Sequence, residues 1–184
     1  FERLPQTLFQ RIIGKSVKGL PIHLLTIGTG NTKILMWSQM HGNESTTTRA
    51  LLDLIPWFLK LSQAQLQKTF TLSIILQLNP DGAKAYTRLN ANDVDLNRDA
   101  IDLTQPESVA LQDLYQEVNP DYCLNLHGQR TIFSAGKMGK TASLSFLAPS
   151  ANLERTLTPS RAKAMQLIVA LKRALEKELP EQVG

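Results

Sequence analysis

Two histidines and a glutamate have the residue types and spacing of a metal site. His41 and Glu44 lie three residues apart, and His127 follows an apolar run much later in the chain. Two histidines and one carboxylate are a recurrent ligand set of catalytic zinc, which keeps its fourth position for water. Imidazole and carboxylate also suit zinc better than calcium or magnesium. A lone histidine after a strand is more often only a hydrogen-bonding residue, so the pattern indicates a candidate zinc site.

A run of charged and amide residues could contribute to the same site. It spans residues 88–99, includes Arg88, Asn97 and Arg98, and follows the most apolar predicted strand. Arginine pairs bidentately with carboxylates, so two arginines beside a zinc ion could bind an anionic substrate group and a developing oxyanion. The same composition also fits a solvated loop. The residues alone leave both interpretations open.

Apolar runs and helical patterns alternate along the chain. We predict a helical or irregular lead-in over residues 1–19. Strands are predicted at residues 21–27, 33–38, 70–78, 122–126 and 143–147, and helices at residues 45–62, 106–118 and 159–179. The last helix is expected to turn Met165, Leu171 and Leu175 toward a core. This alternation predicts a layered α/β fold with a largely parallel sheet, whose strand ends usually carry the chemistry.

Five sequence elements follow one another in a specific order. They are Gly14-Lys15-Ser16 with Gly19-Leu20-Pro21-Ile22, His41-Gly42-Asn43-Glu44, Asn79-Pro80-Asp81-Gly82, Arg88-Leu89-Asn90-Ala91-Asn92 with Val94-Asp95-Leu96-Asn97-Arg98, and His127. In this order they resemble the zinc metallocarboxypeptidases of the pancreatic carboxypeptidase type. The resemblance covers residues 11–130 with readable motifs. It implies a three-layer α/β/α fold with a mixed, largely parallel sheet.

The resemblance also implies roles for the matching residues. The zinc ligands that it implies, for one Zn²⁺ ion per chain, are His41, Glu44 and His127. Arg88 would be catalytic, because it would polarise the scissile carbonyl and stabilise the oxyanion. Asn97 and Arg98 would bind the free carboxylate at the C-terminus of a peptide or protein substrate. The expected activity is hydrolysis of the C-terminal peptide bond by a zinc-activated water.

One part of the family's pattern is not found. The family's general base is a glutamate in a strand-end segment beyond the long helix, after a tyrosine that caps the substrate. The glutamates near the end of this sequence, such as Glu176, Glu178 and Glu181, match no such segment, and we assign none as the base. We expect residues 1–184 to be a single zinc carboxypeptidase-like domain that lacks its C-terminal part. Because a general base contributes about 10²–10⁴-fold, this chain should be a weak peptidase.

Other functions share parts of the pattern. Zinc-dependent deacylases of N-acyl amino acids, of the aspartoacylase and succinylglutamate desuccinylase type, resemble the chain at residues 41–44 and 95–98. The turn at residues 79–82 fits the peptidase better. A non-catalytic pseudo-peptidase could keep the zinc site or the carboxylate site without the base. These alternatives differ from the peptidase in the reaction and not in the metal ligands.

Residues 136–141 end like a phosphate-binding loop, in Gly139-Lys140-Thr141. The full pattern requires a glycine five residues before Gly139, where Ser134 stands. The segment also precedes a predicted strand, whereas a phosphate-binding loop opens a helix. We interpret it as a flexible loop and expect no nucleotide binding.

Composition and charge exclude several other classes. The 184 residues are 42% hydrophobic and carry a net charge of +4, and a chain of this length can bury a sizeable core. Lysines and arginines are scattered, which argues against a nucleic-acid partner. No apolar run approaches the roughly 20 residues of a membrane span. The single cysteine, Cys123, cannot form an intrachain disulfide. The sequence leaves open whether the protein is cytoplasmic or secreted, and its oligomeric state.

Overall fold

The computed structural model describes residues 8–60, 63–128, 134–135, 140–141 and 144–178. The chain forms two compact units, residues 1–128 and residues 129–184. Every residue predicted to act in the site belongs to the first unit. The sheet and helices of that unit therefore decide how the site is assembled.

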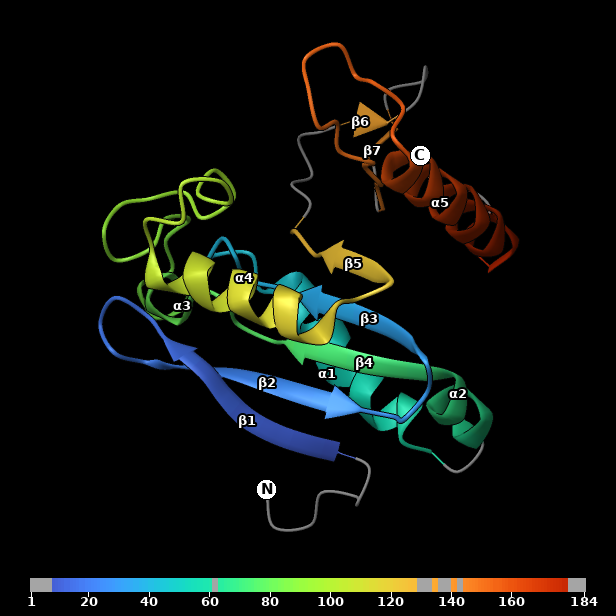
Figure 1. Ribbon diagram of the computed structural model, residues 1–184, viewed down its shortest axis with the longest axis horizontal. Helices are drawn as coiled ribbons and strands as arrows, with labels where there is room; N and C mark the ends of the chain where they lie inside the picture. The colour runs from blue at the N-terminus through green and yellow to red at the C-terminus, as the bar shows by residue number, and fades with distance from the viewer. Residues whose placement is uncertain (1–7, 61–62, 129–133, 136–139, 142–143, 179–184) are drawn as a thin grey trace. The chain divides into compact units, whose positions relative to one another are not determined.

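The described residues of the first unit form a five-stranded mixed sheet (Figure 1). Its strands are β1 (Leu8–Lys15), β2 (Pro21–Ile27), β3 (Thr32–Trp37), β4 (Phe70–Ile75) and β5 (Tyr122–Asn125). They lie in the order β1-β2-β4-β3-β5. β3 runs parallel to both of its neighbours, β4 and β5, whereas β2 pairs antiparallel with β1 and β4. The carboxyl ends of β3, β4 and β5 therefore meet at one edge of the sheet.

Strand β1 lies where we predicted a helical or irregular lead-in, so that prediction is wrong for these residues. β1 is an edge strand, and Phe9 and Ile12 on it are 64% and 55% exposed. Because β1 has no continuous buried face, its sequence lacks the alternation of apolar and polar residues that indicates a strand. Antiparallel pairing with β2, which sets Leu8 opposite Ile27, supplies the backbone hydrogen bonds instead.

Among the described residues of the first unit, four helices connect the strands. They are α1 (Thr46–Phe58), α2 (Ala64–Thr69), α3 (Pro80–Ala85) and α4 (Pro106–Val118). α1 and α4 confirm the helices predicted at residues 45–62 and 106–118. The predicted turn after β4 is instead the start of the short helix α3. The Asn79 side chain accepts a hydrogen bond from the Gly82 N–H at 2.8 Å, and Pro80 opens the helix.

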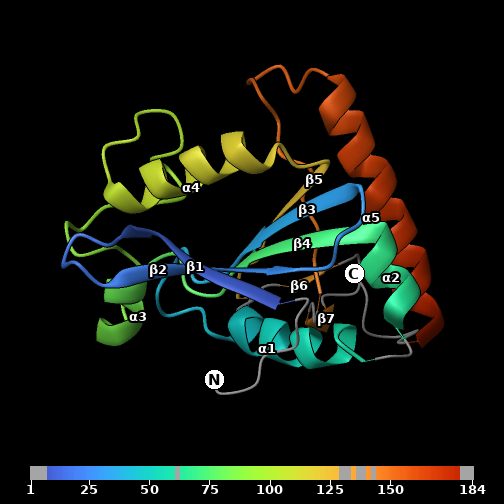
Figure 2. The same ribbon diagram turned by 60° about the horizontal axis from the view of Figure 1, so that its bottom comes forward.

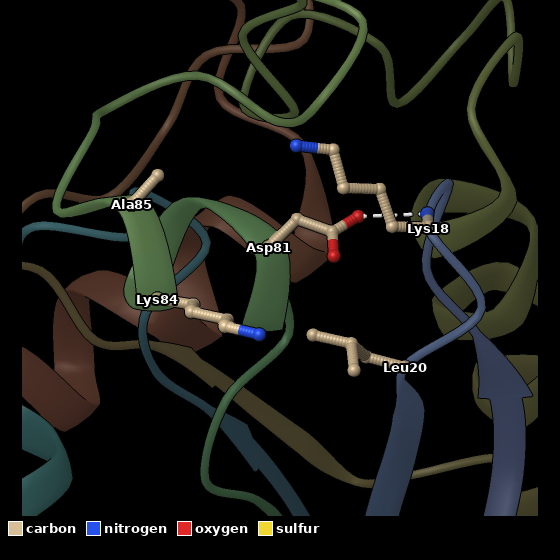
Figure 3. A pocket seen from close by; sticks show the side chains of 5 residues that line it. All are labelled: Lys18, Leu20, Asp81, Lys84 and Ala85. Atoms are coloured by element: carbon tan, nitrogen blue, oxygen red, sulfur yellow. Dashed lines mark hydrogen bonds between the residues drawn. The ribbon is translucent and has the colours of Figure 1, made fainter.

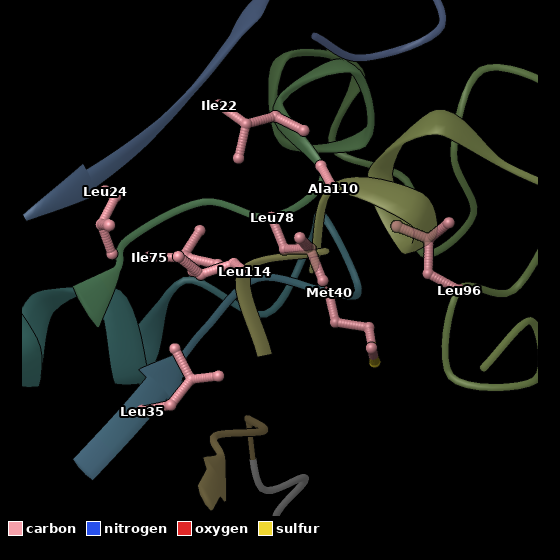
Figure 4. Close-up of a cluster of buried hydrophobic side chains, with 9 residues drawn as sticks. All are labelled: Ile22, Leu24, Leu35, Met40, Ile75, Leu78, Leu96, Ala110 and Leu114. Carbon is pink, nitrogen blue, oxygen red and sulfur yellow. The ribbon is translucent and has the colours of Figure 1, made fainter. Parts of the chain in front are cut away.

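The two faces of the sheet carry two separate hydrophobic cores. The core beside α4 (Figure 4) buries Ile22, Leu24, Leu35, Met40, Ile75, Leu78, Leu96, Ala110 and Leu114. The core beside α1 buries Leu8, Leu25, Ile27, Met36, Leu51, Phe58, Leu72 and Ile74. Neighbouring residues such as Leu35 and Met36 enter opposite cores, because successive side chains of a strand point to opposite faces. Figure 2 shows α4 and α1 on opposite sides of the sheet, which confirms the three-layer α/β/α architecture.

The described part of the second unit consists of a small hairpin and a long helix. β6 (Ser134–Ala135) pairs antiparallel with β7 (Lys140–Thr141), and α5 spans Pro159–Glu178. α5 confirms the helix predicted at residues 159–179. The Thr158 hydroxyl accepts a hydrogen bond from the Arg161 N–H at 3.2 Å and so caps its first turn. Most of the segment interpreted as a flexible loop, residues 136–139, lies outside the described residues.

One prediction for this unit is wrong and another is confirmed only in part. Residues 145–147 form no strand, and Leu147 is 84% exposed, so the apolar alternation there corresponds to no buried face. Ser143, the first residue of that predicted strand, lies outside the described residues. No residue of α5 is buried, and Met165 is 46% exposed, so the predicted inward face of the helix is only partly covered. None of the helices in the described parts of the chain is long and apolar enough to cross a membrane.

Candidate metal centre

The parallel part of the sheet brings the candidate ligands together. His41 lies in the loop that leaves the carboxyl end of β3, and His127 follows the carboxyl end of the adjacent parallel strand β5. Glu44 lies just before helix α1, which starts at Thr46. Side chains from segments far apart in the sequence therefore meet at one sheet edge, where such folds carry their ligand sites.

The loop that carries His41 has an unusual conformation. Gln39 has a φ of 46°, in the left-handed region that residues other than glycine seldom adopt. Its side chain holds this conformation, since Nε2 donates to the Gly42 carbonyl at 2.6 Å and Oε1 accepts from the Thr48 hydroxyl at 2.8 Å. A Cβ on Gly42 would lie 2.0 Å from the Gly82 carbonyl carbon, so only glycine lets this loop pack on α3.

Three potential ligand groups converge on one point. His41 Nδ1 lies 2.9 Å from Glu44 Oε1 and 3.1 Å from His127 Nδ1. His127 Nδ1 lies 3.0 Å from Glu44 Oε2. One ligand atom from each of the three residues lies within 4.8 Å of the other two. We call His41, Glu44 and His127 the metal cluster.

The separations within the metal cluster fit a small tetrahedral cation. Nitrogen and oxygen ligands about 2.0–2.2 Å from a tetrahedral zinc ion lie roughly 3.3–3.6 Å from one another. The separations in the cluster, 2.9–3.1 Å, are only slightly shorter. His41 Nε2 lies 3.1 Å from Asp95 Oδ1, and because a carboxylate only accepts, this nitrogen must carry its proton. In neutral His41 a lone pair on Nδ1 then faces Glu44 and His127, and a cation satisfies these converging acceptors.

Glu44 is held in its charged form. Its partial burial alone would raise the pKa of the carboxyl. Its contacts with the imidazoles of His127 and His41, and the hydrogen bond from the Gly128 N–H at 2.9 Å, outweigh that effect and hold the pKa of Glu44 far below its usual range. A metal ligand must be deprotonated, and Glu44 meets this requirement at neutral pH.

Asp95 joins the cluster to the neighbouring loop, and no role had been predicted for it. Its Oδ1 accepts from His41 Nε2 and from the Asn97 N–H at 2.9 Å, and its Oδ2 accepts from Arg88 Nη2 at 3.1 Å. Its partial burial raises the pKa of Asp95, but these hydrogen bonds outweigh that effect and lower it. A carboxylate that orients a ligating histidine is a recurrent outer-shell partner. Its residue type alone does not distinguish it from Asp93 and Asp99 in the same polar run.

The structure places the other predicted site residues at different distances from the cluster. Arg88 touches it directly, since Nη1 lies 3.4 Å from Glu44 Oε1. Asn97 is joined to it through Asp95. Arg98 is exposed, and its Nη1 donates to the Asn97 carbonyl at 3.3 Å, so it follows Asn97 along the loop without contacting the metal cluster.

A separate pocket of about 330 Å³ lies beside α3 (Figure 3). It is lined by Lys18, Leu20, Asp81, Lys84 and Ala85. Asp81 Oδ2 accepts from the Lys18 N–H at 3.0 Å and so ties the β1–β2 turn to α3. Its other oxygen, Oδ1, is buried without a hydrogen-bond partner among the described residues. None of the predicted site residues lines this pocket.

Comparisons with known proteins bear on the family and the fold of the chain. A model of the zinc carboxypeptidase family matches residues 2–102. Carboxypeptidase SOL1 of Arabidopsis thaliana is 33% identical over 137 residues, which are 63% of this chain and 28% of that protein. The structure of a metallo-carboxypeptidase from Burkholderia cenocepacia superposes with a TM-score of 0.63 at 26% identity, over 70% of this chain and 38% of that one.

A more distant structure covers more of the chain. Carboxypeptidase A from Helicoverpa armigera aligns with a TM-score of 0.70 and 20% identity, over 94% of this chain and 50% of that one. At this identity the likeness concerns the fold alone. The chain spans 28–50% of the length of the three relatives named here. Because the family model matches more than half of its residues, the chain belongs to the zinc carboxypeptidase family.

Proposed function

We propose that this protein is a zinc-dependent metallocarboxypeptidase that hydrolyses the C-terminal peptide bond of peptides or proteins. The observation that carries the proposal is the convergence of His41 Nδ1, His127 Nδ1 and the Glu44 carboxylate within hydrogen-bond distance of one another. Membership of a zinc-dependent family supports zinc as the ion. We assign one ion per chain to this cluster.

The metal cluster has a half-open environment that suits a catalytic site. Zinc in a site with three protein ligands supplies Lewis acidity and lowers the pKa of a coordinated water to about 7. The His41 side chain is 3% exposed, whereas those of Glu44 and His127 are 18% and 33% exposed. One side of the cluster is thus packed into the protein and held by Asp95. A substrate can approach from the other side.

Arg88 is assigned to the scissile carbonyl. Its guanidinium is held by Asp95 through both Nε and Nη2, at 3.3 and 3.1 Å, and lies beside Glu44. Its side chain is 41% exposed, so part of the guanidinium remains free to donate. A fixed cation beside the reacting bond stabilises the negative charge that develops on the carbonyl oxygen.

Asn97 and Arg98 are assigned to the substrate carboxylate. Asp95 holds the Asn97 backbone, because the Asn97 N–H donates to Oδ1 and the Arg98 N–H donates to the Asp95 carbonyl at 2.9 Å. The two side chains offer amide and guanidinium donors to an anion that can only accept. This carboxylate site would restrict hydrolysis to the end of a chain.

The general base is assigned to none of the described residues. A general base typically contributes about 10²–10⁴-fold, so we expect slow hydrolysis by the 184-residue chain even when zinc is bound. Binding of zinc and of a C-terminal carboxylate does not depend on the base. These two properties should therefore be present whatever the rate.

The comparisons favour the peptidase over a deacylase of N-acyl amino acids. The matching family model, the Arabidopsis relative and the Burkholderia structure are carboxypeptidases. A pseudo-peptidase would share the zinc and carboxylate sites and differ only in turnover. The reaction must therefore be measured directly.

A peptide ladder experiment separates the three functions. The zinc-loaded chain is incubated with N-acetylated hexapeptides that end in phenylalanine, lysine or glutamate, and with N-acetyl amino acids, and the products are followed by mass spectrometry. We expect slow loss of one C-terminal residue from the acids and none from the matched C-terminal amides, with Glu44→Gln inactive. Release of acetate would favour the deacylase. Binding of the peptide acids without cleavage would favour the pseudo-peptidase.

A further inference from the structure

A carboxamide can bind a substrate carboxylate only through its NH₂ group. Asn97 has one side-chain oxygen that accepts and one nitrogen that donates, and the two ends have nearly the same shape. If the oxygen faced the substrate, two acceptors would repel each other. The role proposed for Asn97 therefore depends on which way its side chain is turned.

Asn125, the last residue of β5, makes a contact that fixes this choice. Its Nδ2 donates to Asn97 Oδ1 at 3.3 Å and lies 3.6 Å from the Met40 sulfur. The Met40 sulfur can only accept a hydrogen bond, whichever way Asn97 is turned. Turning the Asn125 amide around would set its oxygen against that sulfur, so the Asn125 NH₂ group stays on this side and meets the oxygen of Asn97.

The contact leaves the donor end of Asn97 available. Asn97 Oδ1 is engaged by Asn125, and in the described part of the chain the Asn97 NH₂ group donates to no other group. The Asn97 backbone is held independently, by its N–H donating to Asp95 Oδ1 at 2.9 Å. Backbone position and side-chain orientation thus have separate supports.

We propose that Asn125 is a positioning residue that orients the Asn97 carboxamide so that its NH₂ group faces the substrate carboxylate. This inference rests on the proposed function, in which Asn97 binds that carboxylate. The same strand end also delivers His127 two residues later, so β5 sets both a zinc ligand and the orientation of the carboxylate site. Asn125 itself does not have to touch substrate.

The test uses Asn125→Ala in the full chain, with Cys123→Ala as the matched control. Both residues are exposed on β5 and lie two positions apart, so both changes should leave the fold intact. The zinc-loaded proteins are titrated by NMR with N-acetyl-glycyl dipeptides that end in phenylalanine, lysine or glutamate. Each dipeptide is used as the free acid and as the C-terminal amide. Zinc content is measured for every protein.

We expect wild type and Cys123→Ala to prefer the acid over the amide. Asn125→Ala should bind the acid about threefold to tenfold more weakly, the effect of one hydrogen bond, with unchanged affinity for the amide and unchanged zinc content. In an Asn97→Ala background, Asn125→Ala should have no further effect. This dependence on Asn97 separates positioning from a general structural role.

Two results would overturn the inference alone. They are an unchanged preference for the acid in Asn125→Ala, or an equal loss of affinity for acid and amide. A wild-type protein that binds zinc but does not distinguish acid from amide would instead overturn the carboxylate site of the proposed function, and this inference with it.

Discussion

The first unit contains two groups of polar side chains that are satisfied in opposite ways. In the metal cluster of His41, Glu44 and His127, acceptors converge on one another. The second group, which we call the loop network, consists of Asn90, Asn92, Asp99, Gln105 and Glu107. In the loop network, donors alternate with acceptors: Asn90 Nδ2 donates to Gln105 Oε1 at 2.8 Å and to Glu107 Oε2 at 3.2 Å, and Glu107 Oε1 accepts from the Val17 N–H.

This difference separates a structural site from a binding site. Glu107 is fully buried, but N–H groups of the protein itself satisfy both of its oxygens. A buried polar group is tolerated when it is paired in this way. Glu44 is less buried and belongs to a set of groups that needs a cation between its members. If candidate metal ligands were ranked by the burial of their carboxylates alone, Glu107 would come before Glu44, which is the wrong order.

The largest expected effect is loss of zinc in Glu44→Gln. The amide removes the negative charge and one of the two oxygens that face the histidines. We expect zinc affinity to fall by more than the roughly 10–100-fold that loss of an outer-shell partner costs. Competition with a chromogenic chelator measures this affinity. Glu117→Gln, on the exposed end of α4, is the matched control and should bind zinc like wild type.

Asp95→Asn should have the next largest effect on zinc. The amide can still accept from His41, but it loses the charge that strengthens His41 as a ligand, and its NH₂ group meets the donors of Arg88. We expect zinc affinity to fall about 10–100-fold with little change in secondary structure. Unchanged affinity in the chelator assay would mean that Asp95 only shapes the loop.

Glu107→Gln should affect stability and not zinc. Its NH₂ group would face either the Val17 N–H or the Asn90 NH₂ group, which leaves a buried donor unpaired. We expect the free energy of unfolding of the metal-free protein to fall by about 1–3 kcal/mol in urea denaturation. Glu117→Gln, whose ion pair with Arg11 is exposed, should cost at most about 0.5 kcal/mol. Weaker zinc binding by folded Glu107→Gln would contradict the separation of the two groups.

The smallest effect concerns Asp99 and pH. Burial would raise the pKa of Asp99, but hydrogen bonds from the Thr104 side chain and the N–H groups of Thr104 and Gln105 outweigh it and hold the pKa below its usual range. Because the folded pKa is the lower one, this stabilisation is present above about pH 4 and is lost as pH falls through the folded pKa.

Asp99→Asn should therefore destabilise the protein by roughly 1–2 kcal/mol at pH 6. The difference from wild type should shrink as the pH falls through the lowered pKa of Asp99. Urea denaturation of both proteins between pH 2.5 and pH 6 measures this. A difference that does not depend on pH would show that the charge of Asp99 is not what stabilises the loop.

The sequence pointed to the metal cluster through residue type and strand position. His41 and Glu44 share one short motif, and His127 directly follows an apolar strand, which indicates a candidate site; the order of the five motifs then implied the ligand set. Asp95 and Asn125 could not be assigned in the same way. Their roles depend on which atoms of distant segments meet, and the polar run at residues 88–99 contains several equivalent carboxylates and amides.

The fold could be predicted where the hydrophobic pattern had a single period. The helices α1 and α4 each bury one face. The neighbouring strands β3 and β4 bury both faces. Strand β1 was missed because Phe9 and Ile12 are exposed at the sheet edge, so its sequence does not alternate between apolar and polar residues. Helix α2 was missed because its six residues are too few to show a helical repeat of apolar residues. The strand predicted at residues 143–147 failed for the opposite reason, since its apolar residues alternate without being buried.

The zinc content of the chain is the most direct test of the metal cluster. The purified chain and His127→Ala are reconstituted with zinc, dialysed and measured by elemental analysis, with circular dichroism to compare their folds. The His127 side chain is 33% exposed, so its removal should leave the fold intact. We expect about one zinc per chain in the wild type and almost none in His127→Ala. A wild-type chain that retains no zinc, or a variant that retains as much as wild type, would contradict the assignment of the metal cluster.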